Sequence, residues 1–240
     1  MKKSVVFKVG IIVLSVICVI ALSCLWFCLG ACKADDVAIE EVLSDSSVSC
    51  TVKGNTTVFY PDGAEKGFVF YPGARVEEEA YIPLAHALAE KGILSVIVEM
   101  PMYFPLLDCD AADSIIEEYP EIEEWYIGGH SLGGYAASLY LEDSFEKYEG
   151  LILLASYSGI DFKDTDLSAM TIYGTEDDVL NFDRYNEGLA LLQKDYTEIV
   201  IEGGCHAYFG TYTGQDESLS KITNQEQIEI TVDSIVEFIG

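Results

Sequence analysis

The sequence predicts an α/β fold in which a mainly parallel sheet is covered by helices on both faces. Apolar runs and helical patterns alternate along the chain, as in a series of strand–helix–strand units. The apolar runs do not alternate with polar residues: 151–155 has none, and 94–98 has only Ser95. Strands buried on both faces of a parallel sheet have this composition. Ligands of such sheets bind at the carboxyl ends of the strands, so residues that follow strands are the candidates for a site.

The individual elements follow from hydrophobic periodicity and from flanking Gly and Pro. Strands are expected at 49–52, 57–60, 68–71, 94–98, 125–128, 151–155, 169–173 and 197–201. Helices are expected at 38–49, 77–91, 110–119, 132–141, 185–192 and 225–239. Pro83 predicts either a kink in the second of these helices or a late start near Tyr81. Thr223 and Glu226 have the spacing of a capping box before the last helix.

The N-terminal segment predicts a membrane anchor. Residues 9–29 carry no charge, and 21 helical residues reach roughly 31 Å, enough to cross a bilayer. Lysines precede this run and acidic residues follow it, which places the folded domain outside the cytoplasm. A cleaved signal peptide has a shorter apolar core, about 7–15 residues. Alternatives to the anchor are a secreted form and a lipoprotein, because 29–32 resembles a bacterial lipobox with Cys32 as the lipidated residue. We expect residues 1–34 to form the anchor or signal segment and 35–240 the folded domain.

Charge and cysteine content limit the partners. The formal net charge is −28, from 41 acidic and 13 basic residues. Such a surface repels nucleic acid, so no nucleic-acid partner is expected. Four of the seven cysteines lie in or beside the apolar run. The other three, Cys50, Cys109 and Cys205, are widely spaced and form no CxxC pair, which predicts neither a disulfide framework nor a metal site. No metal and no cofactor are therefore expected.

The segment 128–134 reads Gly-Gly-His-Ser-Leu-Gly-Gly and lies between an expected strand and an expected helix. It contains Gly-x-Ser-x-Gly in the context that a nucleophile elbow requires. The serine sits in a tight turn, and side chains at the flanking glycines would clash with the neighbouring strand and helix. The pattern predicts Ser131 as a nucleophile. The N–H of Leu132, at the start of the helix, is expected to stabilise a developing oxyanion.

A serine nucleophile needs a base, and in this motif the order along the chain is Ser, then Asp or Glu, then His. Of the three histidines only His206 follows Ser131, in a Gly-rich loop after the last expected strand. The pattern therefore predicts His206 as the base. His86 lies in an expected helix and is interpreted as structural. His130 lies inside the elbow, where packing or shaping the site is the expected role.

The acid is expected in the loop after the strand at 169–173, where three carboxylates are adjacent. The spacing Gly-Thr-x-Asp favours Asp177, with Asp178 second and Glu176 third. The alternative is a solvated acidic loop without a catalytic role. Asp177 would orient the base and stabilise its charged form.

A second oxyanion donor is expected in the turn that follows the strand at 68–71. The backbone N–H of Ala74 or of Arg75 occupies the required place. The side chain of Arg75 is a candidate for binding an acidic group on the substrate, and a simple surface arginine is the alternative.

These motifs resemble those of a small bacterial α/β-hydrolase domain family, related in outline to dienelactone hydrolases and small esterases. The matching segments are 70–76, 81–85, 128–134, 150–155, 172–177 and 202–210. The resemblance implies the α/β-hydrolase fold, a Ser131–Asp177–His206 triad and an anchored or exported domain. Two departures matter. Dienelactone hydrolases use a cysteine nucleophile, so their substrate is not carried over, and Cys205 stands where an Asn is expected.

Together these features predict a serine hydrolase that acts on a small acyl substrate through an acyl-enzyme. The short connection at 156–168 predicts a minimal lid and an open pocket. Acyl transfer by the same triad is one alternative. A non-catalytic binding module at the cell surface is the other, although such a module would need neither Ser131 nor His206.

Overall fold

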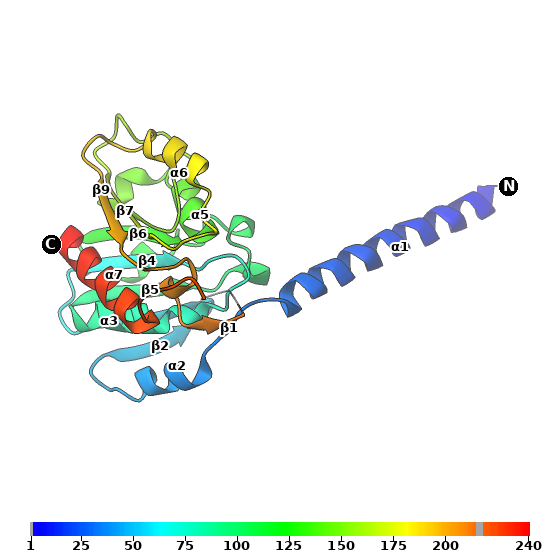
Figure 1. Cartoon of the computed structure of the whole chain (residues 1–240). Coiled ribbons are helices and arrows are strands. Elements are labelled where there is room, and N and C mark those ends of the chain that lie inside the picture. Colours follow the sequence, from blue (N-terminus) through cyan, green and yellow to red (C-terminus); the bar gives the residue numbers. More distant parts are fainter. Residues whose placement is uncertain (1, 215–217) are drawn as a thin grey trace.

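The computed structural model describes residues 2–214 and 218–240 and is built around one eight-stranded sheet (Figure 1). The strand order is β2-β3-β5-β4-β6-β7-β8-β9. β2 and β3 are antiparallel to their neighbours, and all pairs from β5 to β9 are parallel. The strands span Ser49–Lys53 (β2), Thr56–Tyr60 (β3), Lys66–Tyr71 (β4), Ile93–Val98 (β5), Glu124–His130 (β6), Gly150–Leu154 (β7), Ser168–Gly174 (β8) and Thr197–Ile201 (β9). The predicted, mainly parallel sheet is confirmed.

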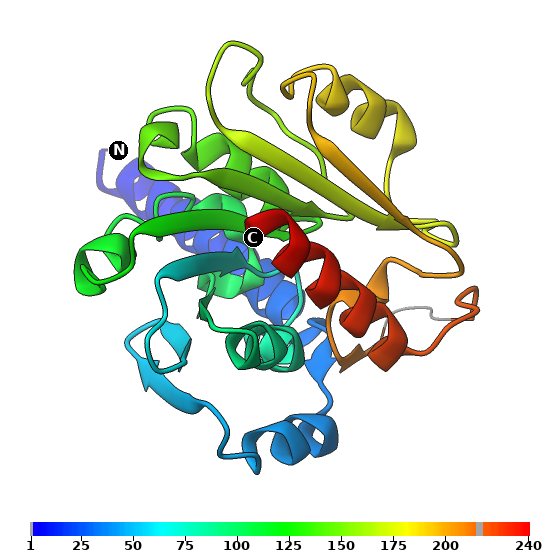
Figure 2. The ribbon, with the colours of Figure 1, turned by 90° about the vertical axis from the view of Figure 1, so that its left-hand side faces the viewer.

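Helices cover both faces of the sheet, and the side chains of β4 show how the core is divided. Phe68 and Phe70 join the apolar cluster that contains α3 and α7, which pack side by side on one face (Figure 2). Val69 and Tyr71 point the other way, into the cluster that contains α5. The helices span Asp36–Leu43 (α2), Ile82–Glu90 (α3), Ile115–Glu118 (α4), Leu132–Tyr140 (α5), Phe182–Leu189 (α6) and Asn224–Ile239 (α7).

Two sequence expectations about helix boundaries are confirmed. α3 follows a short 3₁₀ turn, Glu78–Tyr81 (η1), and has Pro83 in its first turn, where the missing N–H of proline costs nothing. α7 starts with the capping box formed by Thr223 and Glu226. Further 3₁₀ turns span Pro101–Tyr103 (η2), Pro105–Leu107 (η3), Phe145–Lys147 (η4) and Ala207–Phe209 (η5).

The helix predicted at 110–119 is wrong over most of its length, because only Ile115–Glu118 (α4) is helical. The hydroxyl of Tyr71 explains the difference. It donates to the carbonyl of Cys109 (2.8 Å) and accepts from the N–H of Ala112 (2.9 Å). These bonds use backbone groups that a helix would need for its own hydrogen bonds, so the segment forms turns instead.

The helix α1, Lys2–Leu29, projects away from the body of the molecule (Figure 1). Its segment Ile12–Leu29 has a mean hydropathy of 2.8, and its length and composition suit either a membrane span or a signal sequence. The chain joins the body directly afterwards. The N–H of Cys32 donates to the carbonyl of Arg75 (2.7 Å). β1 (Lys33–Ala34) then pairs with β10 (Tyr212–Thr213), and the expected boundary between residues 34 and 35 comes directly after β1.

Candidate active site

Ser131 is the single residue between the end of β6 and the start of α5. Its φ of 52° and ψ of −123° are rare for a residue other than glycine and put backbone strain at this position. Its N–H donates to the carbonyl of Leu154 in β7 (2.9 Å). A Cβ added to Gly129 or Gly133 would lie closer than 3.0 Å to the carbonyl oxygen of Tyr71. The clash expected from the glycine positions is confirmed, and it explains why the strand and the helix can approach so closely around Ser131.

Asp177 and His206 meet at the carboxyl ends of β8 and β9. His206 Nδ1 lies 2.8 Å from Asp177 Oδ2, and the side chain of Asp177 has no exposed area. Asp177 Oδ1 accepts from the N–H groups of Val179 (2.9 Å) and Leu180 (2.8 Å). Three hydrogen bonds therefore fix the carboxylate, which in turn fixes the orientation of the imidazole ring.

The two other carboxylates of this loop make no contact of this kind. Asp178 is exposed. Glu176 forms an ion pair with Lys221, and the hydrogen bond from Lys221 lowers the pKa of Glu176. Asp177 is thus the carboxylate of this loop that the structure brings to His206.

Ser131 and His206 line the same small cavity, which has a volume of about 160 Å³. The cavity is open to solvent and lies at the carboxyl edge of the parallel strands, as the sheet topology predicts. Its other lining residues are Leu132, Tyr135, Ala155, Ser156, Tyr157, Val179, Leu180 and Asn181. Leu132 is the first residue of α5, so its N–H has no partner within the helix and is free to face the cavity.

The turn after β4 adjoins the elbow because β4 and β6 are paired, with Tyr71 opposite Gly129. In this turn the N–H of Gly73 donates to the hydroxyl of Tyr81 (3.0 Å), and that of Arg75 donates to the carbonyl of Tyr103 (2.7 Å). The N–H of Ala74 makes no hydrogen bond to any residue that the structure describes. Of the two expected oxyanion donors, Ala74 is the one whose N–H is not already engaged.

The side chain of Arg75 lies elsewhere than expected. It is not among the residues that line the cavity. Its guanidinium donates to the carbonyl of Gly30 and stacks over the ring of Phe27, 5.3 Å from the ring centre. Carbonyl groups at the end of a helix lack partners and attract cations, which explains this contact. The structure thus gives the guanidinium of Arg75 partners at the end of α1, and its binding to an acidic group on the substrate stays a prediction.

Behind the cavity lies a buried pair, Tyr81 and His130. A packing or shaping role was expected for His130, but sequence reasoning did not find its partner Tyr81. Tyr81 Oη accepts from the N–H of Gly73, so its own proton is available to His130 Nδ1, 2.8 Å away. Burial, and next the charge of His206, hold the pKa of His130 well below 6.5. His130 is therefore neutral at neutral pH and packs against His206, with 4.7 Å between ring centres. The pair connects the turn after β4 with the base.

Gln227 is a second residue that sequence reasoning missed. Its side-chain amide is fully buried, donates to the carbonyl of Cys205 (2.8 Å) and accepts from the N–H of Cys205 (2.9 Å). It thereby holds the residue that precedes His206. This is the position where the resemblance led us to expect an Asn. The one sequence signal is a polar residue within the apolar face of the last helix.

We expect Gln227→Leu to destabilise the protein and to lower its activity. The substitution leaves the buried N–H and carbonyl of Cys205 without partners, which lowers the free energy of unfolding by about 2–4 kcal/mol. Urea unfolding of the variant measures this loss, and the rate of ester hydrolysis reports the displacement of His206. Gln225→Leu is the matched control, because Gln225 is exposed on the same helix and such changes stay within about 0.5 kcal/mol. Equal stability of the two variants would contradict the prediction.

Comparison with known proteins identifies the fold. A profile described as "Alpha/beta hydrolase family" matches residues 67–229, from β4 into α7. No curated protein sequence matches the chain. Among solved structures, a dienelactone hydrolase from Anabaena variabilis superposes with a TM-score of 0.58 at 13% identity, over 78% of this chain and 96% of that one. Est1E from Butyrivibrio proteoclasticus superposes with a TM-score of 0.57 at 14% identity, over 81% of this chain and 98% of that one. The esterase Est2 from Thermogutta terrifontis superposes with a TM-score of 0.56 at 11% identity, over 81% of this chain and 93% of that one. At such identities the likeness shows a shared fold.

Proposed function

The chain belongs to the alpha/beta hydrolase family, and on that premise we propose that it is a serine hydrolase that cleaves an ester, thioester or amide. The observation that carries this proposal is the arrangement at the 160 Å³ cavity. Ser131 lies in a strained turn on the wall of this cavity. His206 lies on the same wall, and its Nδ1 is hydrogen-bonded to the buried carboxylate of Asp177. A residue with an unfavourable φ persists only where the surrounding structure imposes it, and such residues cluster at functional sites.

The proposed mechanism assigns one role to each group. Ser131 Oγ attacks the carbonyl carbon of the substrate, and His206 Nε2 takes the hydroxyl proton. Asp177 keeps the other proton of the ring on Nδ1 and stabilises the imidazolium. The N–H groups of Leu132 and Ala74 donate to the oxyanion of the tetrahedral intermediate.

The intermediate collapses to an acyl-enzyme when His206 gives its proton to the leaving group. A water molecule, deprotonated by His206, then attacks the acyl carbon, and Ser131 leaves with the proton that His206 returns. No metal or cofactor takes part in these steps.

The size of the cavity supports a small acyl group as substrate. Its volume of about 160 Å³ is below the roughly 300–1,000 Å³ of pockets that enclose drug-sized ligands. The connection between β7 and β8 contains no helix among its described residues, so no lid extends the cavity from that side. A short acyl chain, or an acyl group at an exposed end of a larger molecule, fits these dimensions.

The N-terminal helix supports a location at the membrane. We propose that α1 is an uncleaved anchor and that the hydrolase domain lies outside the cytoplasm, as the flanking charges indicate. The contacts of Arg75 with Gly30 and Phe27 then keep the domain close to the membrane surface. Cleavage before Cys32 followed by lipidation would keep it there too, whereas simple secretion would release it. The acidic surface disfavours a nucleic-acid partner.

A fluorophosphonate probe tests the proposal, because it reacts only with an activated serine. We expect the wild-type chain to be labelled at Ser131, as located by peptide mass mapping. We also expect p-nitrophenyl acetate and butyrate to be hydrolysed with a higher kcat/KM than p-nitrophenyl palmitate. A folded wild-type protein that takes no label and cleaves none of these esters would point to a binding module instead. Faster turnover with an added alcohol or amine acceptor would point to acyl transfer.

A further inference from the structure

A second cavity, with a volume of about 700 Å³, lies between α2, α3 and α7 and shares no lining residue with the cavity at Ser131. Among the charged groups on its wall, acidic ones predominate. Five carboxylates line it, together with one lysine and one histidine: Glu41, Asp45, Glu90, Glu229, Asp233, Lys91 and His86. The lysine is itself paired with Asp233, at 3.7 Å. A concave surface with this excess of negative charge concentrates cations.

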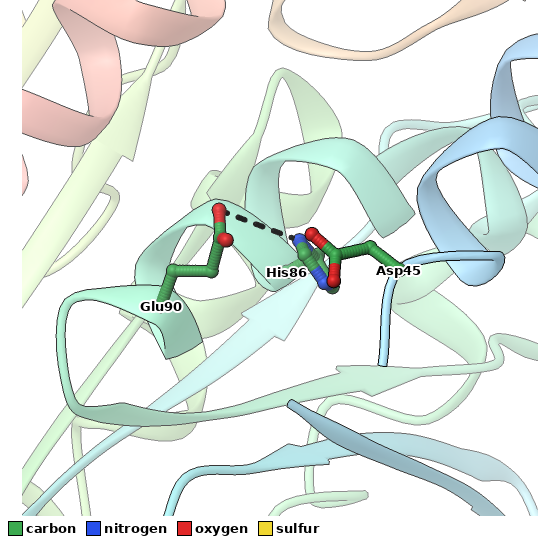
Figure 3. A group of neighbouring side chains, drawn as sticks. All are labelled: Asp45, His86 and Glu90. Carbon is green, nitrogen blue, oxygen red and sulfur yellow. Dashed lines mark ion pairs between the residues drawn. The ribbon is translucent and has the colours of Figure 1, made fainter. Parts of the chain in front are cut away.

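Three of these groups, from different parts of the chain, lie next to one another (Figure 3). His86 and Glu90 lie one turn apart on α3, and Asp45 comes from the loop after α2. One donor atom from each lies within 4.8 Å of the other two. His86 Nδ1 and Glu90 Oε2 are 3.6 Å apart. This separation exceeds a hydrogen bond and is close to the roughly 3.4 Å between two ligand atoms that are each about 2.1 Å from a tetrahedral zinc ion.

His86 has no hydrogen bond that would explain its burial. Its side chain is only 7% exposed. Its Nε2 is buried without a partner, and its Nδ1 has no hydrogen bond to any residue that the structure describes. Buried polar groups in folded proteins almost always have a partner. Nε2 would still lack a partner, but a cation bound at Nδ1 would give the nitrogen that faces Glu90 a partner.

Ser47 orients both carboxylates. Its N–H donates to Asp45 Oδ1 (2.8 Å), and its hydroxyl donates to Glu90 Oε1 (3.2 Å). Hydrogen bonds of this kind, from outside the ligand set to the ligands, are typical of metal sites.

We propose that Asp45, His86 and Glu90 bind a divalent transition metal ion of the zinc type. An imidazole nitrogen with two carboxylate oxygens suits zinc, whereas calcium and magnesium prefer ligand sets made only of oxygen. The two carboxylates balance the charge of the ion. The cavity leaves room for a water molecule as the fourth ligand. The ion would tie the loop after α2 to α3, on the side where the chain arrives from the N-terminal helix.

This inference revises the sequence-based expectation that the chain has no metal site. That expectation rested on the spacing of the cysteines, none of which takes part here. Asp45 lies far from His86 in the sequence, so no spacing motif connects them. Only the packing of α2 against α3 brings the three side chains together.

Titration calorimetry of the full-length chain in detergent, after treatment with EDTA, tests the site. We expect one Zn²⁺ per chain and much weaker binding of Ca²⁺. The double variant Asp45→Asn/Glu90→Gln should bind Zn²⁺ at least about 100-fold more weakly, because losing even an outer hydrogen-bond partner of a ligand costs 10–100-fold. The control is Glu229→Gln/Asp233→Asn, which removes the same charge from the same cavity and should keep the affinity within about threefold, since salt screens distant exposed charges.

Three results would overturn the proposal. Equal weakening of Zn²⁺ binding in both double variants would mean diffuse attraction to an acidic surface. Ca²⁺ binding as tight as Zn²⁺ binding would mean that the imidazole is not a ligand. An absence of Zn²⁺ binding to the wild-type chain would exclude the site. Asp45 and Glu90 are exposed, so both double variants should fold, and their metal-free melting temperatures check this.

Discussion

Ser131→Ala should lower kcat for p-nitrophenyl ester hydrolysis by about 10⁵–10⁶-fold and abolish labelling by a fluorophosphonate probe. The substitution removes the attacking oxygen but leaves the Leu132 and Ala74 N–H groups in place. In a serine protease the loss of the nucleophile alone costs about as much as the loss of the whole triad. The remaining rate would come from the oxyanion donors and from binding. Steady-state kinetics at saturating substrate measure this effect.

Ser156→Ala is the matched control for this prediction. Ser156 lines the same cavity, and its hydroxyl is engaged in a bond to the carbonyl of Ser131 (2.6 Å). We expect its loss to lower kcat by no more than about tenfold, because one neutral hydrogen bond is worth about 1 kcal/mol. The Ser156 variant should still be labelled. Ser131→Ala activity near the wild-type level, with activity lost in Ser156→Ala, would place the nucleophile at Ser156.

Much of the candidate site was predictable because its parts are local motifs. Ser131 follows directly on β6, and Asp177 and His206 lie in the loops that follow β8 and β9, all strands expected from the sequence. In a parallel sheet the ends of such strands must meet at one edge. The order of the motifs along the chain then left one histidine for the base. The strands and the positions of Ser131, Asp177 and His206 could therefore be predicted without knowledge of long-range contacts.

The rest of the molecule depends on contacts between distant segments. Tyr81 reaches His130 across 49 positions, and Gln227 reaches Cys205 across 22. Arg75 was expected at the substrate because it follows a strand end, but its guanidinium donates to the carbonyl of Gly30, 45 positions away.

The helix expected at 110–119 fails for a similar reason. Its local pattern is helical, but the hydroxyl of Tyr71, a residue of another element, takes the backbone groups that the helix would use. In each of these cases a contact with a segment elsewhere in the fold decides the outcome, and no local sequence signal reports it.

The choice between the carboxylates after β8 gives the second large prediction. Asp177→Asn should lower kcat by about 10⁴-fold, the loss seen when the acid of a triad becomes an amide. Asp177 Oδ1 accepts two backbone N–H groups, so the amide oxygen of Asn would take that place. Its NH₂ would then face His206 Nδ1 as a donor. The ring would have to carry its proton on Nε2, where it could not accept the proton of Ser131.

Asp178→Asn removes the same charge one residue away and should change kcat by less than about threefold, because Asp178 is exposed and its field is screened. Kinetics of the two variants, with melting temperatures to check the fold, separate the two positions. If Asp178→Asn abolishes activity and Asp177→Asn does not, the carboxylate that contacts His206 in this structure is not the one that supports catalysis. The loop would then have to rearrange when substrate binds.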